Sequence, residues 1–190
     1  MSIIRARQRI TTTLLLLSAC CAFMPPAAQT AEYAAGYGDD RAMIEDLQAR
    51  YAFAMDFRDA DTYASTFTEG GVLDWANGEV KGRQAIREFI QTQPSRGGFV
   101  AKSDSAAARP PAARHSITNV VVRIEGNKAY GRAYWTQLGN DNSERSAILG
   151  SYGHYEDELE KIDGQWYFTR RTIYNEQLDR RAGPLQNPAW

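Results

Sequence analysis

The sequence predicts an α+β domain: a cone-shaped α+β barrel in which three N-terminal helices pack inside a curved antiparallel sheet. Two observations support this class. Apolar residues recur at helical spacing in the first half, and the second half carries runs of β-branched and aromatic residues separated by short turn signals. At 190 residues, 43% of them hydrophobic, the chain is long enough for one domain with a core and too short for two large ones.

The helices are expected in the first half of the domain. The first has Asp39 or Asp40 as its N-cap and runs to about Phe57, with apolar residues three or four positions apart. A short second helix follows Asp61, and a third covers residues 83–91. This part of the chain therefore supplies the helical layer.

The strands are expected in the second half, where we predict four segments of an antiparallel meander: 115–124, 128–138, 147–161 and 165–174. Before them, the pair Asn77-Gly78 predicts a tight hairpin between two short strands. Residues 93–114 lack periodicity and are rich in Gly, Ser, Ala and Pro, so we expect either a lid or a disordered loop there.

Residues 1–20 are interpreted as an export signal, because three arginines precede an apolar run that is shorter than the roughly 20 residues of a membrane span. The end of this run, Leu17-Ser18-Ala19-Cys20, resembles a bacterial lipobox, in which lipidated Cys20 becomes the mature N-terminus. The alternative is a plain secretory signal that is cleaved at a nearby alanine. Both interpretations predict an exported protein. It is expected either in the periplasm or at the outer membrane, where the lipid would be its anchor.

The mature chain is expected to have three parts. Residues 21–38 form a flexible tether, 39–176 form the folded domain, and 177–190 form a C-terminal tail over its surface. Removal of the three arginines of the signal lowers the basic count from 22 to 19 against 23 acidic residues, so the mature net charge is −4. No nucleic-acid partner is expected, since phosphate binding needs a clustered positive face.

Several kinds of chemistry are excluded by what the folded domain lacks. Both cysteines, Cys20 and Cys21, lie at the processing site, which leaves no disulfide, thiol nucleophile or cysteine metal site in the domain. There is also no His-x-x-x-His pair, no calcium loop and no glycine-rich phosphate loop. We therefore expect neither a metal nor a cofactor.

The two histidines of the chain can be considered individually. His115 opens a strand, where alternation places it on one face with Ile117, Asn119 and Val121. It is either part of a mixed pocket lining or a strand-end histidine in contact with solvent. His154 is interpreted as a residue on the face of a paired strand.

Three further charged or polar positions stand out. Asp56 lies in an apolar run of the first helix, so it either ends the helix in water or is buried beside a partner. Tyr51 is about 140° round the helix from Asp56 and either borders a pocket or lies in the core. Arg170 and Arg171 alternate on the last strand, and the inward one needs an anion or a substrate oxygen.

A set of short motifs occurs in a recognisable order over about residues 40–174. It comprises Ile44-x-x-Leu47-x-x-x-Tyr51-x-x-x-x-Asp56-x-x-Asp59, Tyr63-x-x-x-Phe67, Gly82-x-x-x-Ile86, Arg114-His115-x-x-x-Asn119, Gly153-x-Tyr155 and Asp163-Gly164-x-Trp166. Together these motifs resemble the SnoaL-like branch of the nuclear-transport-factor-2-like superfamily. Enzymes of this group with a similar pattern include scytalone dehydratase, bile-acid 7α-dehydratase and lindane dehydrochlorinase.

This resemblance implies a set of site residues. In these enzymes an Asp on the first helix and a His at the start of a strand form a catalytic dyad, and Asp56 and His115 occupy those positions. Tyr51 matches a tyrosine of the bile-acid enzyme. By the same resemblance, Trp75 matches an aromatic pocket position and Arg171, or alternatively Arg170, matches a pocket arginine. Asn119, on the predicted face of His115, is a third predicted substrate-binding residue.

The expected function is that of a cofactor-independent lyase or isomerase that acts on a small hydrophobic molecule. Polycyclic molecules are among the expected substrates. An imidazole, with an ordinary pKa of about 6.5, suits a general base near neutral pH, and a carboxylate can fix its tautomer. Two alternatives stay open: a non-catalytic module that binds an apolar ligand in the cell envelope, and a structural or assembly subunit. Relatives of this fold are commonly oligomers, which implies a homodimer or homotrimer.

Overall fold

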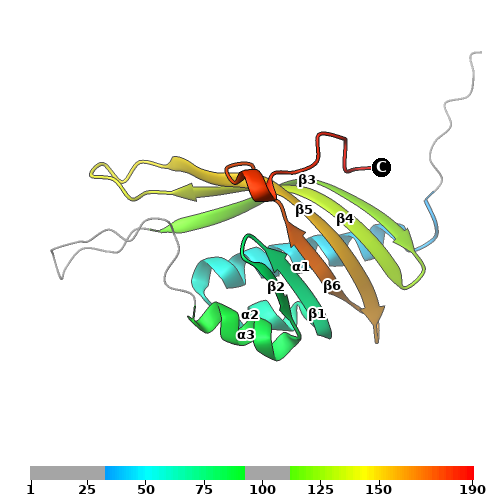
Figure 1. The fold of residues 1–190 in the computed structure, drawn as a ribbon. Coiled ribbons are helices and arrows are strands. Elements are labelled where there is room, and N and C mark those ends of the chain that lie inside the picture. The colour runs from blue at the N-terminus through cyan, green and yellow to red at the C-terminus, as the bar shows by residue number, and fades with distance from the viewer. Residues whose placement is uncertain (1–32, 93–111) are drawn as a thin grey trace, which may run out of the picture. The chain divides into compact units, whose positions relative to one another are not determined.

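A curved six-stranded sheet forms the frame of the domain (Figure 1). Our computed structural model describes residues 33–92 and 112–190, and Ala34–Trp190 form one unit. The predicted export signal, Cys20, the tether up to residue 32 and the loop over 93–111 lie outside the described residues. The strands are β1 (Phe67–Trp75), β2 (Gly78–Lys81), β3 (Ala113–Glu125), β4 (Lys128–Gly139), β5 (Ile148–Ile162) and β6 (Gln165–Ile173).

The spatial order of the strands is β2-β1-β6-β5-β4-β3. Strands β3 to β6 form the antiparallel meander that the turn signals predict, and β1 pairs with β2 as a hairpin. The expectation of a purely antiparallel sheet was wrong, because β1 runs parallel to β6, with Leu73 opposite Arg171. The hydrophobic pattern specifies which residues face the core, but it does not specify in which direction a distant hairpin joins the sheet edge.

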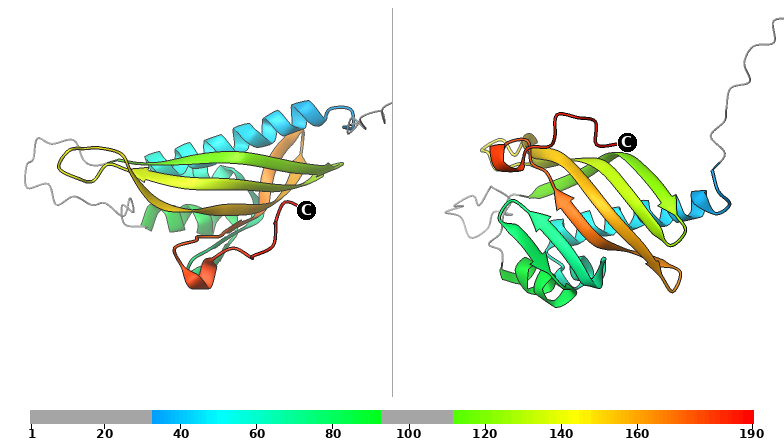
Figure 2. Two further views of the ribbon diagram at one scale, coloured as in Figure 1. Left: turned by 90° about the horizontal axis from the view of Figure 1, so that it is seen from above. Right: turned by 45° about the vertical axis from the view of Figure 1, so that its right-hand side comes forward.

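Three helices cover one face of the sheet (Figures 1 and 2): α1 (Tyr37–Phe57), α2 (Ala60–Ser65) and α3 (Arg83–Thr92). The N-cap of helix α1 is Gly36, three or four residues earlier than predicted, so Asp39 and Asp40 lie in the first turn rather than at the cap. Carboxylates there interact favourably with the helix dipole. Helix α2 begins after Asp59, whose side chain accepts a hydrogen bond from the backbone N–H of Thr62.

Buried aromatic side chains fill the space between the helices and the sheet. The Tyr51 ring lies 4.5 Å from that of Tyr63 and 5.8 Å from that of Phe168, measured between ring centroids. Tyr155 and Phe67 complete the cluster at 6.1 and 6.2 Å from Tyr51. Such large, tightly packed rings supply most of the apolar burial of a small domain, and here they hold α1 against β5 and β6.

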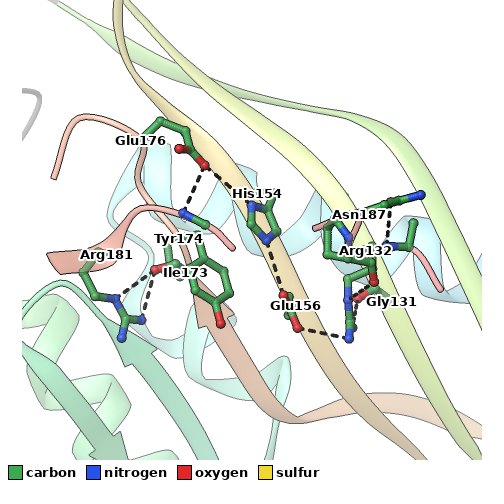
Figure 3. Close-up of polar contacts among 12 residues, drawn as sticks. Gly131, Arg132, His154, Glu156, Ile173, Tyr174, Glu176, Arg181 and Asn187 are labelled. Atoms are coloured by element: carbon green, nitrogen blue, oxygen red, sulfur yellow. Dashed lines mark hydrogen bonds and ion pairs between the residues drawn. The ribbon is translucent and has the colours of Figure 1, made fainter. Parts of the chain in front are cut away.

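The chain after β6 crosses the opposite face of the sheet and includes a 3-10 turn, η1 (Asp179–Arg181) (Figures 2 and 3). It covers His154, which stacks on Tyr174 at 4.5 Å between ring centroids. Gly183 lies against the His154 ring, where a Cβ atom would clash. Arg181 fixes the turn by donating to the carbonyl of Ile173 at 3.0 Å.

Candidate active site

Asp56 and His115 meet where the last turn of α1 lies against the start of β3. Oδ1 of Asp56 is 2.6 Å from Nδ1 of His115, and Oδ2 accepts the backbone N–H of the same histidine at 2.9 Å. The carboxylate side chain is 5% exposed and the imidazole 13% exposed. One carboxylate therefore holds both the ring and the backbone of His115, so the ring orientation is fixed from two directions.

This contact also determines which ring nitrogen of His115 is free. A charged carboxylate can only accept hydrogen bonds, so Nδ1 of His115 carries the proton that Asp56 binds. In the neutral ring, Nε2 then keeps its lone pair. A histidine held in this way has a base at Nε2 and a carboxylate positioned to stabilise the imidazolium after proton uptake.

A cavity of about 430 Å³ lies between α1 and the edge strand β3, and both members of the dyad line it. The walls come from one stripe of α1 and the first half of β3, and they consist of Glu45, Gln48, Ala49, Ala52, Phe53, Asp56, Arg114, His115, Ile117 and Val120. The apolar side chains and the exposed ring of Phe53 suit a hydrophobic ligand. His115 is thus part of a pocket lining, which was one of its two predicted roles.

Tyr51 lies in the core rather than on this wall. Its side chain is fully buried, and its hydroxyl accepts a hydrogen bond from Tyr63 at 2.7 Å. Burial raises the pKa of Tyr51, an effect that the nearby Arg171 partly offsets. The pKa of Tyr155 is raised well above its usual value, chiefly by burial, and the charge of Asp56 contributes. Both phenols therefore stay neutral near pH 7.

Arg171 is the inward arginine, and its partner is an anion. Both Arg171 and Asp157 are fully buried, joined by hydrogen bonds of 2.8 Å from Nε and 2.7 Å from Nη2. The guanidinium carbon also lies 4.0–4.2 Å from the ring centroids of Tyr51, Tyr155 and Phe168. Burial lowers the pKa of Arg171, but the Asp157 charge outweighs it, so the pKa is raised overall. Arg171 was expected to bind substrate and is instead enclosed by protein.

Asn119 does not line the described cavity, because it lies in a β-bulge of β3. The register of β3 shifts between Thr118 and Val121, and Asn119 has a left-handed backbone with φ 54°. The alternation that grouped Asn119 with His115 is therefore wrong beyond the bulge, and Val120 lines the cavity instead. Asn is one of the few residues that tolerate such a backbone.

The remaining sequence-predicted residues lie on other parts of the domain. Trp75 packs on Phe89 with 4.8 Å between ring centroids and is not among the cavity residues. Arg170 is on the outer side of β6, 2.8 Å from Glu79. His154 is on a paired strand, as predicted, and its Nε2 is 3.4 Å from Glu156 (Figure 3).

Sequence reasoning missed Gln48 and Arg114 as cavity residues. Gln48 belongs to the stripe of α1 that ends at Asp56, and this stripe is adjacent to the apolar one. A second stripe of small and polar residues ending at an acid was the available signal. Arg114 places its guanidinium 4.5 Å from the Phe57 ring and donates to the carbonyl of Ala113 at 2.6 Å, so it brings positive charge beside the dyad.

Two negative findings concern the described ranges 33–92 and 112–190. Within them no three His, Cys, Asp or Glu side chains gather in an arrangement that could hold a metal ion. Nor does any helix in that part of the chain have both the length and the apolar character needed to span a membrane.

The chain belongs to the SnoaL-like domain family, whose pattern matches residues 38–172. This family includes dehydratase and isomerase enzymes. The predicted resemblance to the SnoaL-like and nuclear-transport-factor-2-like group is confirmed, and so is the α+β class of the fold. No curated protein sequence matches the chain.

Solved structures share this fold. A protein of unknown function from Mycobacterium tuberculosis is 24% identical with a TM-score of 0.61, covering 80% of this chain and 84% of its own. From Novosphingobium aromaticivorans, a "Putative Scytalone Dehydratase" is 22% identical (TM-score 0.59; 78% and 95% covered). A "Putative Aromatic Ring Hydroxylase" from the same organism is 30% identical (TM-score 0.52; 70% and 87% covered). These names differ in reaction, so the site must carry the functional argument.

Proposed function

We propose that this protein is a cofactor-independent lyase or isomerase, dehydratase-like in mechanism, that acts on a small hydrophobic molecule bound between α1 and β3. The single observation that carries the proposal is that Asp56 forms hydrogen bonds with both the ring and the backbone of His115 at the wall of a largely apolar cavity. A carboxylate-held imidazole with Nε2 free is an arrangement for moving a proton. Membership of a family that contains dehydratases and isomerases supports the same reaction class.

In an elimination, Nε2 of His115 removes a proton from the carbon next to the one that bears the hydroxyl group. The electron pair of that C–H bond forms the double bond, and the C–O bond breaks. The imidazolium returns its proton to the departing oxygen, so the products are the alkene and one water molecule. In an isomerisation, the same proton returns to a different carbon, and nothing leaves.

The residues around the dyad have separate tasks. Asp56 orients the ring and stabilises the imidazolium by a charge-assisted hydrogen bond. Arg114, which lines the cavity next to His115, would favour negative charge that develops on a substrate oxygen. Apolar side chains beside the dyad, such as Ala52 and Ile117, lower the local dielectric constant and so strengthen both interactions.

The experiment uses 5-nitrobenzisoxazole, whose ring opens when a base removes its single acidic C–H proton and the N–O bond breaks. We expect the wild type to catalyse this opening and His115→Ala to lose about 10²–10⁴-fold in kcat/KM. Added imidazole should restore part of the activity of His115→Ala. His154→Gln is the matched control, since it removes the other imidazole, which lies on the opposite face of the sheet.

The outcomes separate an enzyme from a binding module. Equal turnover by the wild type and His115→Ala would overturn the proposal. Absence of turnover, combined with tight binding of an apolar compound by both proteins, would favour a module that holds an apolar ligand. Once a natural substrate is found, loss of one water from the product distinguishes dehydration from isomerisation.

A further inference from the structure

Gln48, in the middle of α1, has a buried carboxamide that no group in the described protein satisfies. The residue is 1% exposed, and it lines the cavity that holds the dyad. Neither its Oε1 nor its Nε2 has a hydrogen-bond partner among the described residues. Buried polar groups in folded proteins are nearly always paired. An unpaired amide on a cavity wall therefore points to a partner that the chain itself does not supply.

The Gln48 amide lies beside other buried polar groups. Gly131 on β4 faces it, and a Cβ atom there would lie 3.7 Å from Nε2 of Gln48 and 3.4 Å from Oδ2 of Asp157. The Asp157 carboxylate is a close buried acceptor, and its two oxygens accept from Nε and Nη2 of Arg171 at 2.8 and 2.7 Å. Nη1 of Arg171 also has no hydrogen-bond partner among the described residues, so the Gln48 amide and this guanidinium N–H are both unsatisfied in the interior beside the cavity.

The position of Gln48 relative to the dyad sets the length of a ligand. Gln48 and Asp56 are eight residues apart on one face of α1, which is about 12 Å along the helix axis. Between them lies Ala52, whose small side chain leaves the wall open. A ligand that follows the helix from His115 to Gln48 is consequently elongated, and a cavity of about 430 Å³ has room for two or three fused or linked rings.

We propose that Gln48 is a specificity-determining residue that binds a hydroxyl group at the far end of an elongated, otherwise apolar substrate whose reacting carbon lies at His115. The hydroxyl accepts from Nε2 or donates to Oε1, so one group satisfies part of the buried amide. The inference rests on the proposed function, because it assigns the same cavity to the substrate. It adds a substrate class: elongated molecules that carry an oxygen substituent at each end of a rigid apolar ring system.

Calorimetric titration with two probes tests this assignment: biphenyl, and biphenyl-4,4'-diol, which has a hydroxyl group at each end. The variant is Gln48→Leu, and Gln84→Leu makes the same change at an exposed site on α3. We expect Gln48→Leu to weaken binding of the diol about tenfold and to leave binding of biphenyl unchanged or tighter. Gln84→Leu should bind both probes as the wild type does.

Three results would overturn the assignment: equal weakening of both probes by Gln48→Leu, no weakening of either, or failure of the wild type to bind the diol. Thermal unfolding gives a second readout. Leu is close to Gln in size and removes the unpaired amide, so the Tm of Gln48→Leu should equal or exceed that of the wild type. A marked fall in Tm would mean that Gln48 has a structural role.

The binding test is separate from the catalytic one. His115→Ala keeps Gln48, so it should still lose diol affinity when Gln48→Leu is added. If His115 proves unnecessary for ring opening of 5-nitrobenzisoxazole, the proposed function fails while this pattern of binding stands. If Gln48→Leu does not selectively weaken binding of the diol but His115 is required for ring opening, the assignment of Gln48 fails and the proposed function stands.

Discussion

Replacing Asp56 with asparagine tests how the dyad works while changing little in its shape. The carboxamide oxygen of Asn can still accept the backbone N–H of His115, which now lies 2.9 Å from Oδ2. Its NH2 group then faces Nδ1, at the place where a carboxylate oxygen is 2.6 Å away. Because NH2 can only donate, Nδ1 must become an acceptor, and the proton moves to Nε2. The base would then be absent from the cavity.

The size of the effect follows from this geometry. Both hydrogen bonds to His115 then involve a neutral amide instead of a charged carboxylate, which should lower the free energy of unfolding by about 1.5–3 kcal/mol. The catalytic loss should be larger, because the wrong tautomer presents a donor where a base is needed. An Asp-to-Asn change behind the histidine of a serine protease lowers kcat by about 10⁴. We expect Asp56→Asn to lower kcat/KM for 5-nitrobenzisoxazole by about 10²–10⁴.

Two assays check this prediction. Initial rates of ring opening give kcat/KM, and nitrogen NMR of the imidazole side chains identifies the protonated ring nitrogen of His115. Urea unfolding shows whether the variant is folded under the assay conditions. A variant with wild-type rates, or a slow variant in which Nδ1 still carries the proton, would refute the tautomer argument.

Three further predictions concern stability. Asp157→Ala leaves the buried Arg171 unpaired and should lower the free energy of unfolding in urea by about 3–5 kcal/mol. The double variant Asp157→Leu/Arg171→Met should lose less, and equal losses in the two variants would contradict the argument from an unpaired buried charge. Burial raises the pKa of Asp40, but hydrogen bonds from Lys161 and Trp166 outweigh it, so the folded pKa is lowered. Asp40 therefore adds stability above its unfolded pKa of about 3.9, which is lost as pH falls through the folded value, and Asp40→Asn should lower the urea midpoint at pH 6 but not in strong acid. Burial, followed by the effect of Tyr51, raises the pKa of Tyr63 well above 10; stability should fall as pH rises above about 10, with tyrosinate absorbance appearing as the domain unfolds.

The sequence predicted the element order and the residues of the dyad because both depend on local patterns. Apolar spacing located α1 and α3, and turn signals such as Asp163-Gly164 separated the strands of the meander. Asp56 and His115 were predicted by motif position, and their contact followed because α1 ends against the start of β3. Motif order thus carried information about which residues lie close in space.

Other features depend on pairing that no local pattern specifies. The bulge at Asn119 reverses the alternation of β3, so Val120 takes the place on the cavity wall that sequence reasoning gave to Asn119. The anion required by Arg171 is Asp157 on the neighbouring strand, directly opposite it in the antiparallel register. Both facts require the strand register, which becomes visible only once β3 to β6 are assembled.

Asp56 and Gln48 both depart from the rules that the rest of the domain follows. A carboxylate in the last turn of a helix faces the negative end of the dipole, and the last turn of α1 has no basic residue to compensate it. A buried amide without partners among the described residues is likewise unfavourable. Both residues lie on the stripe of α1 that faces β3 across one cavity. Local costs that converge on a single wall are expected where a sequence is selected for a ligand rather than for stability. If that is the reason, Gln48→Leu should stabilise the empty protein while weakening its hold on the diol, and a variant that does both would link the two departures to one function.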